Sequence, residues 1–415
     1  MTTAAMRTVV IAGGSIAGLS SARELRRAGF DGSIEMIDAD QHAPYRRPAV
    51  SKAILTGHNE PADIAIGVPA ELEVTVHGGV TLRALDVAGK LLHGDAGGTP
   101  VRFGYDGLVI ATGSAARPWR PPAGLDGVHS LRSVADGMAL RAALATAGHA
   151  VIVGGGFIGL EVASAARSMG VNVTVVEAAP VPLGHVLGAG LGEHLARVHR
   201  DHGVQMRCGV TVTGWHGQER VESIVLSDGA EIEAGLVLAC VGSQPAVGWL
   251  QGSGLDLGDG VRCDRNCVAA GADQVVAAGD VASWLNPCFG ARMRVEHWAN
   301  AIEQGTFAAR ALLGQAAPAG FSSVPYFWSE QYGIRLQSVG VCVGHDETLL
   351  LRHCGQTMVV GYGRAGRVIG VAGYDAGTAV GRVSGQKSGV LGYRKHIEQG
   401  ASLAALAERA PVSTP

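Results

Sequence analysis

The sequence predicts an α/β protein that combines two domains built on parallel sheets with a smaller C-terminal α+β domain. Three observations support this prediction. A strand, a glycine-rich loop, a helix and a second strand follow one another in residues 7–40. The same order recurs in residues 151–177. From Ser323 onwards, short apolar runs alternate with turn residues, which is typical of a small antiparallel sheet.

Composition limits the class of protein. The chain has 415 residues, 47% of them hydrophobic, and a formal net charge of −3, so it can bury the cores of two or three domains. This charge balance argues against a nucleic-acid binder, which would carry a basic face. No apolar run approaches the roughly 18 residues of a spanning helix. Residues 9–19 could imitate a secretory signal, but their glycines recur at nucleotide-loop spacing, so we expect a cytoplasmic protein that binds no membrane.

The cysteines and histidines do not predict a metal site. No cysteine pair has C-x-x-C spacing, and Cys263 and Cys267 have no histidine nearby. We expect most cysteines to be small buried hydrophobes. Three histidines share a short polar helix predicted for residues 191–202, and we expect them to lie on its solvated face: His194, His199 and His202.

The first repeat begins with the strand at residues 9–11 and continues through the loop GGSIAG. A helix is predicted for residues 19–28 and a second strand for residues 33–38. Gly13, Ser15 and Gly18 hold the fingerprint positions G-x-G-x-x-G, with a serine in the middle. Alone, such a loop is a weak signal of dinucleotide binding.

The second repeat is more regular. Gly154, Gly156 and Gly159 permit a tight turn, a close approach of the backbone to a pyrophosphate, and packing of the helix on the strand. Glu177 closes the second strand, where a carboxylate accepts hydrogen bonds from a ribose and repels a 2′-phosphate, which favours NADH over NADPH. Two such copies about 140 residues apart predict two Rossmann-like dinucleotide-binding domains.

Several other segments carry motif-like patterns. PYRRPAVSK at residues 44–52 predicts a loop that leads into a short helix, and DGLVIATG at residues 106–113 predicts a buried strand. VVAAGD ends in Asp280 at the carboxyl end of a strand, where ligands of parallel sheets bind. A long helix is predicted for residues 294–313, further helices from about residue 381 and near residues 403–408, and an aromatic strand within VPYFWSEQYG.

These motifs together resemble a known family. PYRRPAVSK looks like PYxRPPLSK, and VPYFWSEQYGIRLQSVG is close to VPYFWSDQYGxxLQxxG, both motifs of the FAD-dependent NADH:ferredoxin reductases that serve cytochrome P450 and ring-hydroxylating oxygenases. The resemblance extends over residues 7–409. It implies an FAD-binding domain formed by residues 1–112 and 243–318, an NAD-binding domain formed by residues 113–242, and a C-terminal interface domain formed by residues 319–415.

The resemblance also assigns cofactor contacts. For FAD, it places the pyrophosphate over Gly13, Ser15 and Gly18, and it leaves the adenosine ribose to Asp38 or Asp40. The remaining expected FAD contacts are Lys52, Leu82, Thr112, Gly113, Arg132, Asp280, Trp298, Ile302 and Trp328, and Gln304 is expected near the ring. The expected NAD contacts are Gly154, Gly156, Ile158, Gly159, Glu161, Glu177 and Gly242.

Lys52 and Glu161 are the expected catalytic residues. The resemblance implies that Lys52 lies beside the flavin N5 and that Glu161 pairs with it. Hydride transfer from NADH to FAD requires mainly positioning and electrostatics, and a cation beside N5 stabilises the anionic reduced flavin.

The second half-reaction follows from a missing motif. Residues 46–55 contain no cysteine, whereas the disulphide reductases of the superfamily carry C-x₄-C there. Electrons are therefore expected to leave one at a time for a [2Fe–2S] ferredoxin. Because such carriers are usually acidic, five cations are candidate docking residues: Arg292, Arg294, Lys387, Arg394 and Lys395.

Two alternatives remain open from the sequence. One is an NADH-binding flavoprotein that resembles apoptosis-inducing factor and acts through protein contacts, although this chain lacks the long C-terminal insertion expected of that class. The other is a monodehydroascorbate- or nitrite-type reductase with the same core. The sequence predicts no oligomeric state.

Overall fold

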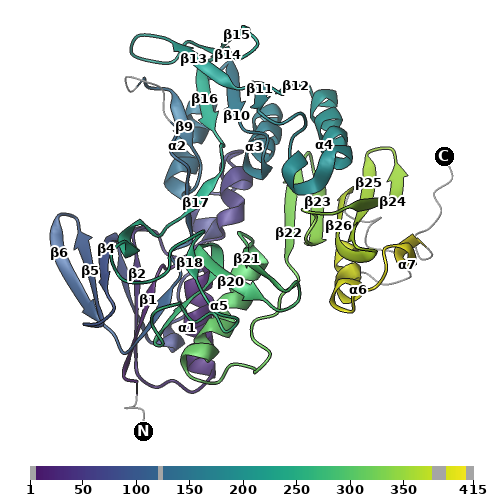
Figure 1. Cartoon of the computed structure of the whole chain (residues 1–415). Coiled ribbons are helices and arrows are strands. Elements are labelled where there is room, and N and C mark those ends of the chain that lie inside the picture. The colour runs from purple at the N-terminus through teal and green to yellow at the C-terminus, as the bar shows by residue number, and fades with distance from the viewer. Residues whose placement is uncertain (1–5, 120–124, 376–388, 408–415) are drawn as a thin grey trace. The chain divides into compact units, whose positions relative to one another are not determined.

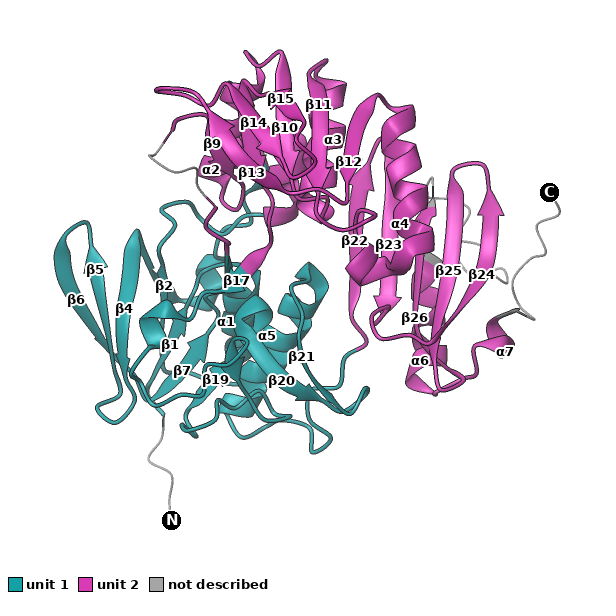
Figure 2. Ribbon diagram, turned by 45° about the horizontal axis from the view of Figure 1, so that its top comes forward, with its two compact units in different colours: residues 1–46, 64–115, 244–323 teal, residues 47–63, 116–243, 324–415 magenta. Residues whose placement is uncertain are grey.

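The computed structural model describes residues 6–119, 125–375 and 389–407, which form two compact units (Figures 1 and 2). Unit 1 comprises Met1–Arg46, Ile64–Ala115 and Gln244–Ser323, and unit 2 comprises Arg47–Asp63, Ala116–Ser243 and Val324–Pro415. The chain passes between the units in β8 (Ser114–Ala116) and again in β17 (Ser243–Pro245). The predicted division into three domains remains a prediction.

Unit 1 is built on a five-stranded parallel sheet with the order β19-β7-β1-β2-β3. Its strands are β1 (Thr8–Ala12), β2 (Ser33–Asp38), β3 (Val74–Gly78), β7 (Gly107–Ile110) and β19 (Val275–Ala277). Central strands of β-branched and aliphatic residues are buried on both faces, as expected for a parallel sheet covered by helices.

Two helices pack together beside this sheet: α1 (Ile16–Arg27) and α5 (Trp298–Leu312). A Cβ atom at Gly305 would lie 2.4 Å from the Ala17 carbonyl oxygen, so the two backbones touch at this glycine. Ser21 Oγ donates to the Gly305 carbonyl at 2.9 Å. This close packing attaches the later segment of unit 1 to its first repeat.

Unit 1 also carries two small sheets. The first is antiparallel and contains β4 (Val80–Asp86), β5 (Leu91–Ala96) and β6 (Thr99–Gly104). The second contains β18 (Val261–Arg262), β20 (Ala282–Asn286) and β21 (Ala291–Arg294).

Unit 2 begins with the short turns Arg47–Ala49 and Val50–Ile54, the second of which is π-helical. Its parallel sheet has the order β12-β11-β10-β16-β9. The strands are β9 (Val128–Ser130), β10 (His149–Val153), β11 (Asn172–Glu177), β12 (Val204–Cys208) and β16 (Leu236–Ala239). The helices are α2 (Val134–Leu144), α3 (Phe157–Ser168) and α4 (Gly184–Asp201), and a small sheet contains β13 (Val212–His216), β14 (Ser223–Leu226) and β15 (Glu231–Glu233).

The C-terminal part of unit 2 is a five-stranded antiparallel sheet with the order β22-β23-β26-β25-β24. Its strands are β22 (Tyr326–Gln331), β23 (Ile334–Gly340), β24 (Glu347–Cys354), β25 (Thr357–Arg364) and β26 (Arg367–Asp375), followed by α6 (Arg394–Glu398) and α7 (Ala404–Ala407). Figure 1 shows α4 beside this sheet. Apolar side chains of α4 and of the sheet belong to one buried cluster. The predicted fold class is confirmed.

Two expectations meet other outcomes. The start of the helix expected from about residue 381 lies outside the described residues, and α4 begins seven residues before the predicted residue 191. Within the described ranges, no helix is both long and apolar enough to cross a bilayer.

Candidate functional site

The first glycine-rich loop is sterically determined. Gly13 adopts φ +114°, and a Cβ atom there would lie 2.2 Å from the Ala111 carbonyl oxygen. A Cβ atom at Gly18 would lie 2.0 Å from the Gly13 carbonyl oxygen. Between them, Ser15 caps α1 with ordinary extended backbone (φ −78°, ψ −166°). Only glycine therefore fits at the first and third fingerprint positions, whereas the middle position accepts a side chain.

The second loop repeats this geometry in unit 2. Gly154 adopts φ +110° with its hypothetical Cβ atom 2.2 Å from the Cys240 carbonyl, and a Cβ atom at Gly159 would lie 2.1 Å from the Gly154 carbonyl. Gly156 caps α3 with φ −78° and has open space where a Cβ atom would stand. No steric demand of the protein thus explains Gly156. It keeps the helix N-terminus accessible, where unpaired N–H groups favour an anion.

The acids at the strand ends are equivalent in the two repeats. Asp38 Oδ2 accepts a hydrogen bond from the Gly14 N–H at 2.9 Å, and Glu177 Oε2 accepts one from the Gly155 N–H at 2.6 Å. The other oxygen of Glu177 accepts from the Ala179 N–H at 2.7 Å. The sequence left Asp38 and Asp40 as alternatives, and this shared geometry identifies Asp38 as the counterpart of Glu177.

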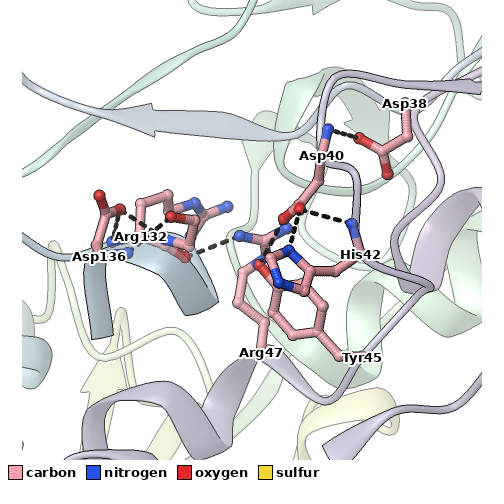
Figure 3. Close-up of polar contacts among 8 residues, drawn as sticks. Asp38, Asp40, His42, Tyr45, Arg47, Arg132 and Asp136 are labelled. Carbon is pink, nitrogen blue, oxygen red and sulfur yellow. Dashed lines mark hydrogen bonds and ion pairs between the residues drawn. The ribbon is translucent and has the colours of Figure 1, made fainter. Parts of the chain in front are cut away.

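Asp40 lies in a different network (Figure 3). Its Oδ1 accepts from the backbone and ring nitrogens of His42, and its Oδ2 accepts from the Tyr45 hydroxyl at 3.0 Å. Although partial burial opposes ionisation, these hydrogen bonds lower the pKa of Asp40 below its usual value. Asp40 therefore orders the loop that follows β2.

Lys52 and Glu161 form an ion pair within unit 2. Lys52 Nζ lies 2.7 Å from Glu161 Oε2 and also donates to the Pro48 carbonyl at 3.0 Å. The same Oε2 accepts from the Ser51 hydroxyl at 2.5 Å, and Oε1 accepts from the Ser329 hydroxyl at 2.6 Å. The π-helical turn thus supplies two partners, and β22 one, to the carboxylate that α3 carries. Glu161 is only 6% exposed, so these donors replace the water that burial removed.

Arg132 is held by its backbone at the start of α2 (Figure 3). Its carbonyl accepts from Arg47 Nη1 at 2.8 Å, and its N–H donates to Asp136 Oδ2 at 3.0 Å. Ser133 and Asp136 form a reciprocal capping box that fixes the first turn of the helix. Arg132 therefore has a defined backbone position in unit 2.

Three further expected FAD residues of unit 1 lie just beyond the carboxyl ends of β7 and β19: Thr112, Gly113 and Asp280. Thr112 Oγ1 donates to the Ala246 carbonyl at 3.0 Å, and Ser114 Oγ donates to Asp280 Oδ2 at 3.1 Å. Gly113 follows Thr112 with φ +70°. Since Gly13 touches the Ala111 carbonyl, the first loop lies at this same sheet edge. Parallel sheets bind their ligands there.

The remaining predicted residues are distributed over several other elements. Trp298 begins α5, which also carries Ile302 and buries Gln304, while Leu82 lies on β4. In unit 2, the predicted NAD site includes Ile158 on the first turn of α3 and Gly242 after β16. The Gly242 carbonyl accepts a hydrogen bond from the Arg117 N–H at 2.9 Å. Trp328 stands on β22 and stacks with Tyr326 at a centroid distance of 5.9 Å.

The expectation of a solvated histidine face is wrong. His194 and His199 are buried, because α4 packs against the C-terminal sheet instead of facing solvent. Sequence reasoning also missed Ser51, Ser329 and Gln331 as partners of the site. A buried serine or glutamine has no periodic signature, so only its place in a motif could have drawn attention to it.

Three of the five candidate docking cations have structural roles. Arg292 donates to the carbonyls of Cys263 and Ser283, Arg294 pairs with Asp259 and Glu296, and Arg394 donates to the Val324 carbonyl. Lys395 is exposed, and Lys387 lies outside the described residues. Among the described residues, no group of three or more histidine, cysteine or acidic side chains is arranged to hold a metal ion.

Comparison with known proteins reveals extensive similarity. Residues 7–305 match the model of the pyridine nucleotide-disulphide oxidoreductases, and residues 326–407 match the reductase C-terminal domain. The chain is 36% identical over 345 residues to the ferredoxin–NAD(+) reductase subunit of a benzene 1,2-dioxygenase system from Pseudomonas putida, covering 82% of each chain.

It is also 36% identical over 373 residues to the ferredoxin reductase component of a chlorobenzene dioxygenase from a Cupriavidus species, covering 89% of each. A crystal structure of a covalent putidaredoxin reductase–putidaredoxin complex superposes with a TM-score of 0.88 at 26% identity, covering 99% of this chain and 97% of that one.

Proposed function

We propose that this chain, which belongs to the pyridine nucleotide-disulphide oxidoreductase family, is an FAD-dependent NADH:ferredoxin reductase. The observation that carries the proposal is the Lys52–Glu161 ion pair, which occurs in a chain with two dinucleotide loops and no cysteine in residues 46–55. The relatives named as reductase components of dioxygenase systems support the same function.

The residues of unit 1 fit FAD. The first loop and the N-terminus of α1 suit a pyrophosphate, because the loop glycines leave backbone N–H groups accessible. Ser15 adds a hydroxyl that can donate to a phosphate. Asp38, by its equivalence to Glu177, is the residue that we propose for the adenosine ribose, and Asp280 is proposed for the ribityl chain.

The residues of unit 2 fit NADH. The second loop, with its sterically free Gly156, suits the pyrophosphate, and Glu177 is the residue that we propose for the adenosine ribose. Both oxygens of Glu177 accept backbone hydrogen bonds, so its carboxylate is held in one orientation. A 2′-phosphate would meet this fixed negative charge.

In the proposed reaction, bound FAD would supply the redox chemistry: it would accept a hydride from NADH and release the two electrons singly to a ferredoxin. Lys52 is the residue that we propose would supply a positive charge to the bound flavin. Glu161 holds the ammonium group through Oε2, and the Pro48 carbonyl accepts a second of its three N–H bonds, which leaves one N–H for the cofactor. The protein adds position and charge, and neither residue needs to exchange a proton during the hydride step.

The acceptor is proposed to be a [2Fe–2S] ferredoxin that serves a cytochrome P450 or a ring-hydroxylating oxygenase. We also propose a cytoplasmic location, since the seven cysteines are all free, as is usual in reducing compartments.

The test is the reduction of cytochrome c by NADH with and without an added [2Fe–2S] ferredoxin. We expect strong dependence on the ferredoxin, because electrons must leave through an external carrier. A rate of cytochrome c reduction that stays unchanged when any of the ferredoxins is added would contradict the proposal. It would favour an NADH-binding flavoprotein that acts through protein contacts, or a reductase for a small acceptor.

The coenzyme preference provides a second expected result. Replacing Glu177 with glutamine keeps an acceptor for the Gly155 N–H but removes the negative charge. The ratio of kcat/KM for NADPH to that for NADH should rise by roughly tenfold, the loss of one screened charge repulsion. Glu193→Gln, which changes an exposed carboxylate on α4, is the matched control and should leave the ratio unchanged. An equal ratio in both variants would remove Glu177 from coenzyme selection.

A further inference from the structure

A continuous row of hydrogen bonds, three of them buried and the first half-buried, ends on Glu161. The Tyr332 hydroxyl lies 2.8 Å from His199 Nδ1, and His199 Nε2 lies 3.0 Å from Gln331 Oε1. Gln331 Nε2 donates to Ser329 Oγ at 3.2 Å, and Ser329 Oγ donates to Glu161 Oε1 at 2.6 Å. All five residues belong to unit 2, and four successive hydrogen bonds join α4, the β22–β23 hairpin and α3.

The direction of every bond in this row follows from the carboxylate. An ionised carboxylate only accepts, so Ser329 must donate to it and can then only accept from the Gln331 amide. The Gln331 oxygen in turn needs a donor, which must be His199 Nε2–H. In a neutral ring, which burial of His199 favours, Nδ1 then carries a lone pair and accepts from the Tyr332 hydroxyl. The row is consistent with a single arrangement of protons, in which His199 is neutral and protonated at Nε2.

Burial protects this arrangement. His199 is 0% exposed, and Gln331 and Ser329 are each 1% exposed, so water does not compete for these bonds. Burial, with a smaller contribution from the nearby His202, lowers the pKa of His199 to about 4, which keeps the ring neutral at physiological pH. Tyr332 is also held by contacts outside the row. Its ring stacks on the His202 ring with 3.7 Å between the centroids, and its backbone N–H donates to Ser164 Oγ at 2.8 Å.

The row divides the two oxygens of Glu161 between different partners. Oε1 is committed to Ser329, while Oε2 accepts from Ser51 and Lys52. Rotation of the carboxylate would break the hydrogen bond from Ser329 to Oε1. The Ser329 hydroxyl would then no longer be oriented to accept from the Gln331 amide. The orientation of the acid that holds Lys52 therefore depends on residues of the C-terminal sheet and of α4.

We propose that Ser329, Gln331 and His199 are positioning residues that fix the Glu161 carboxylate toward Lys52 through this directed row of hydrogen bonds. The consequence for flavin reduction rests on the proposed function. The proton arrangement itself does not. The competing explanation is a polar network that only stabilises the packing of α4 on the sheet.

The first experiment is nitrogen NMR on the FAD-loaded enzyme labelled with ¹⁵N-histidine. His199→Gln assigns the His199 signals by their disappearance. We expect a neutral ring at pH 7 that carries its proton on Nε2. In Ser329→Ala the direction of the row is no longer imposed by the carboxylate, so we expect signals averaged over both tautomers. A charged ring, or a proton on Nδ1 in the wild-type enzyme, would overturn the proposed row.

The second experiment measures reduction of the flavin by NADH in stopped flow. Ser329→Ala should lower the limiting rate by about tenfold, the loss of one hydrogen bond of ordinary strength, and Ser329→Thr should restore it. Gln331→Met interrupts the row at its middle without touching Glu161 and should slow the step in the same direction. The matched control is Ser338→Ala, which removes another buried hydroxyl of the same sheet, one that lies 3.4 Å from Cys342 Sγ.

The outcomes separate the two proposals. If NADH reduces the flavin of Ser329→Ala and of Gln331→Met at the same limiting rate as that of Ser338→Ala, the positioning role is refuted. If the wild-type flavin is not reduced by NADH at all, the proposed function fails, whereas the NMR result still decides whether the row exists.

Discussion

Replacing Glu161 with glutamine, or Lys52 with methionine, is expected to slow reduction of the flavin by NADH by roughly two orders of magnitude, the usual effect of removing one preorganised electrostatic group. Lys52→Met removes the positive charge, and Glu161→Gln removes the anion that holds it. Stopped-flow measurement of the limiting rate isolates this step from the reaction with ferredoxin.

A double-mutant cycle sharpens this prediction. Each single variant leaves its partner without a counter-charge. The double variant Lys52→Met/Glu161→Gln should therefore raise the activation free energy of flavin reduction by much less than the sum of the two single variants. The single variants should also lower the free energy of unfolding by about 2 kcal/mol, less than the 3–5 kcal/mol of a fully buried pair, since the Lys52 side chain keeps 20% exposure.

The control for the cycle is Arg141→Met, which breaks an ion pair with Glu60 elsewhere in unit 2. That pair is solvent-exposed, so its loss should change stability by less than about 1 kcal/mol and leave the rate unchanged. Rates of the Lys52 and Glu161 variants that match this control would remove both residues from the mechanism.

The second large effect concerns the nicotinamide loop. Gly154→Ala is expected to destabilise the protein by about 3 kcal/mol or more, because alanine is strained at φ +110° and its Cβ atom would lie 2.2 Å from a backbone oxygen. Gly156→Ala should leave the melting temperature unchanged or slightly raised, since its Cβ atom meets open space.

Gly156→Ala should weaken NADH binding even though it leaves the stability of the protein unchanged. In Gly156→Ala, the added methyl group stands where the backbone is to approach the pyrophosphate, and the Kd for NADH should rise by at least about tenfold. Calorimetric unfolding and titration of NADH test both variants. Unchanged NADH affinity in Gly156→Ala would mean that this loop does not bind the coenzyme.

The two glycine-rich loops show which features of the fold local sequence can predict. The glycine spacing in residues 13–18 and 154–159 predicted two strand–loop–helix units, and both formed. This succeeded because the requirement for glycine arises within the loop and from the neighbouring strand. The choice between Asp38 and Asp40 could not be made in this way, since it depends on which side chain reaches the Gly14 N–H.

The histidines of α4 illustrate the limit. Their polar character suggested a solvated face, but α4 is covered by a sheet that begins more than a hundred residues later. Likewise, Arg292 and Arg294 read as surface cations, yet they tie together backbone carbonyls and acids of their own unit. A charge or a ring in a sequence does not reveal which partner will cover it.

The sequence by itself determined the α/β class, the two dinucleotide loops, the acids at their strand ends and the absence of a redox cysteine pair. Each of these is recognisable within a short stretch of the chain, although the first glycine of each loop also lies against a strand that is distant in the sequence. Only the tertiary structure decided how Glu161 is held. Ser51, Ser329, Gln331 and His199 come from three separate elements, and a buried carboxylate acquires its donors only when those elements pack.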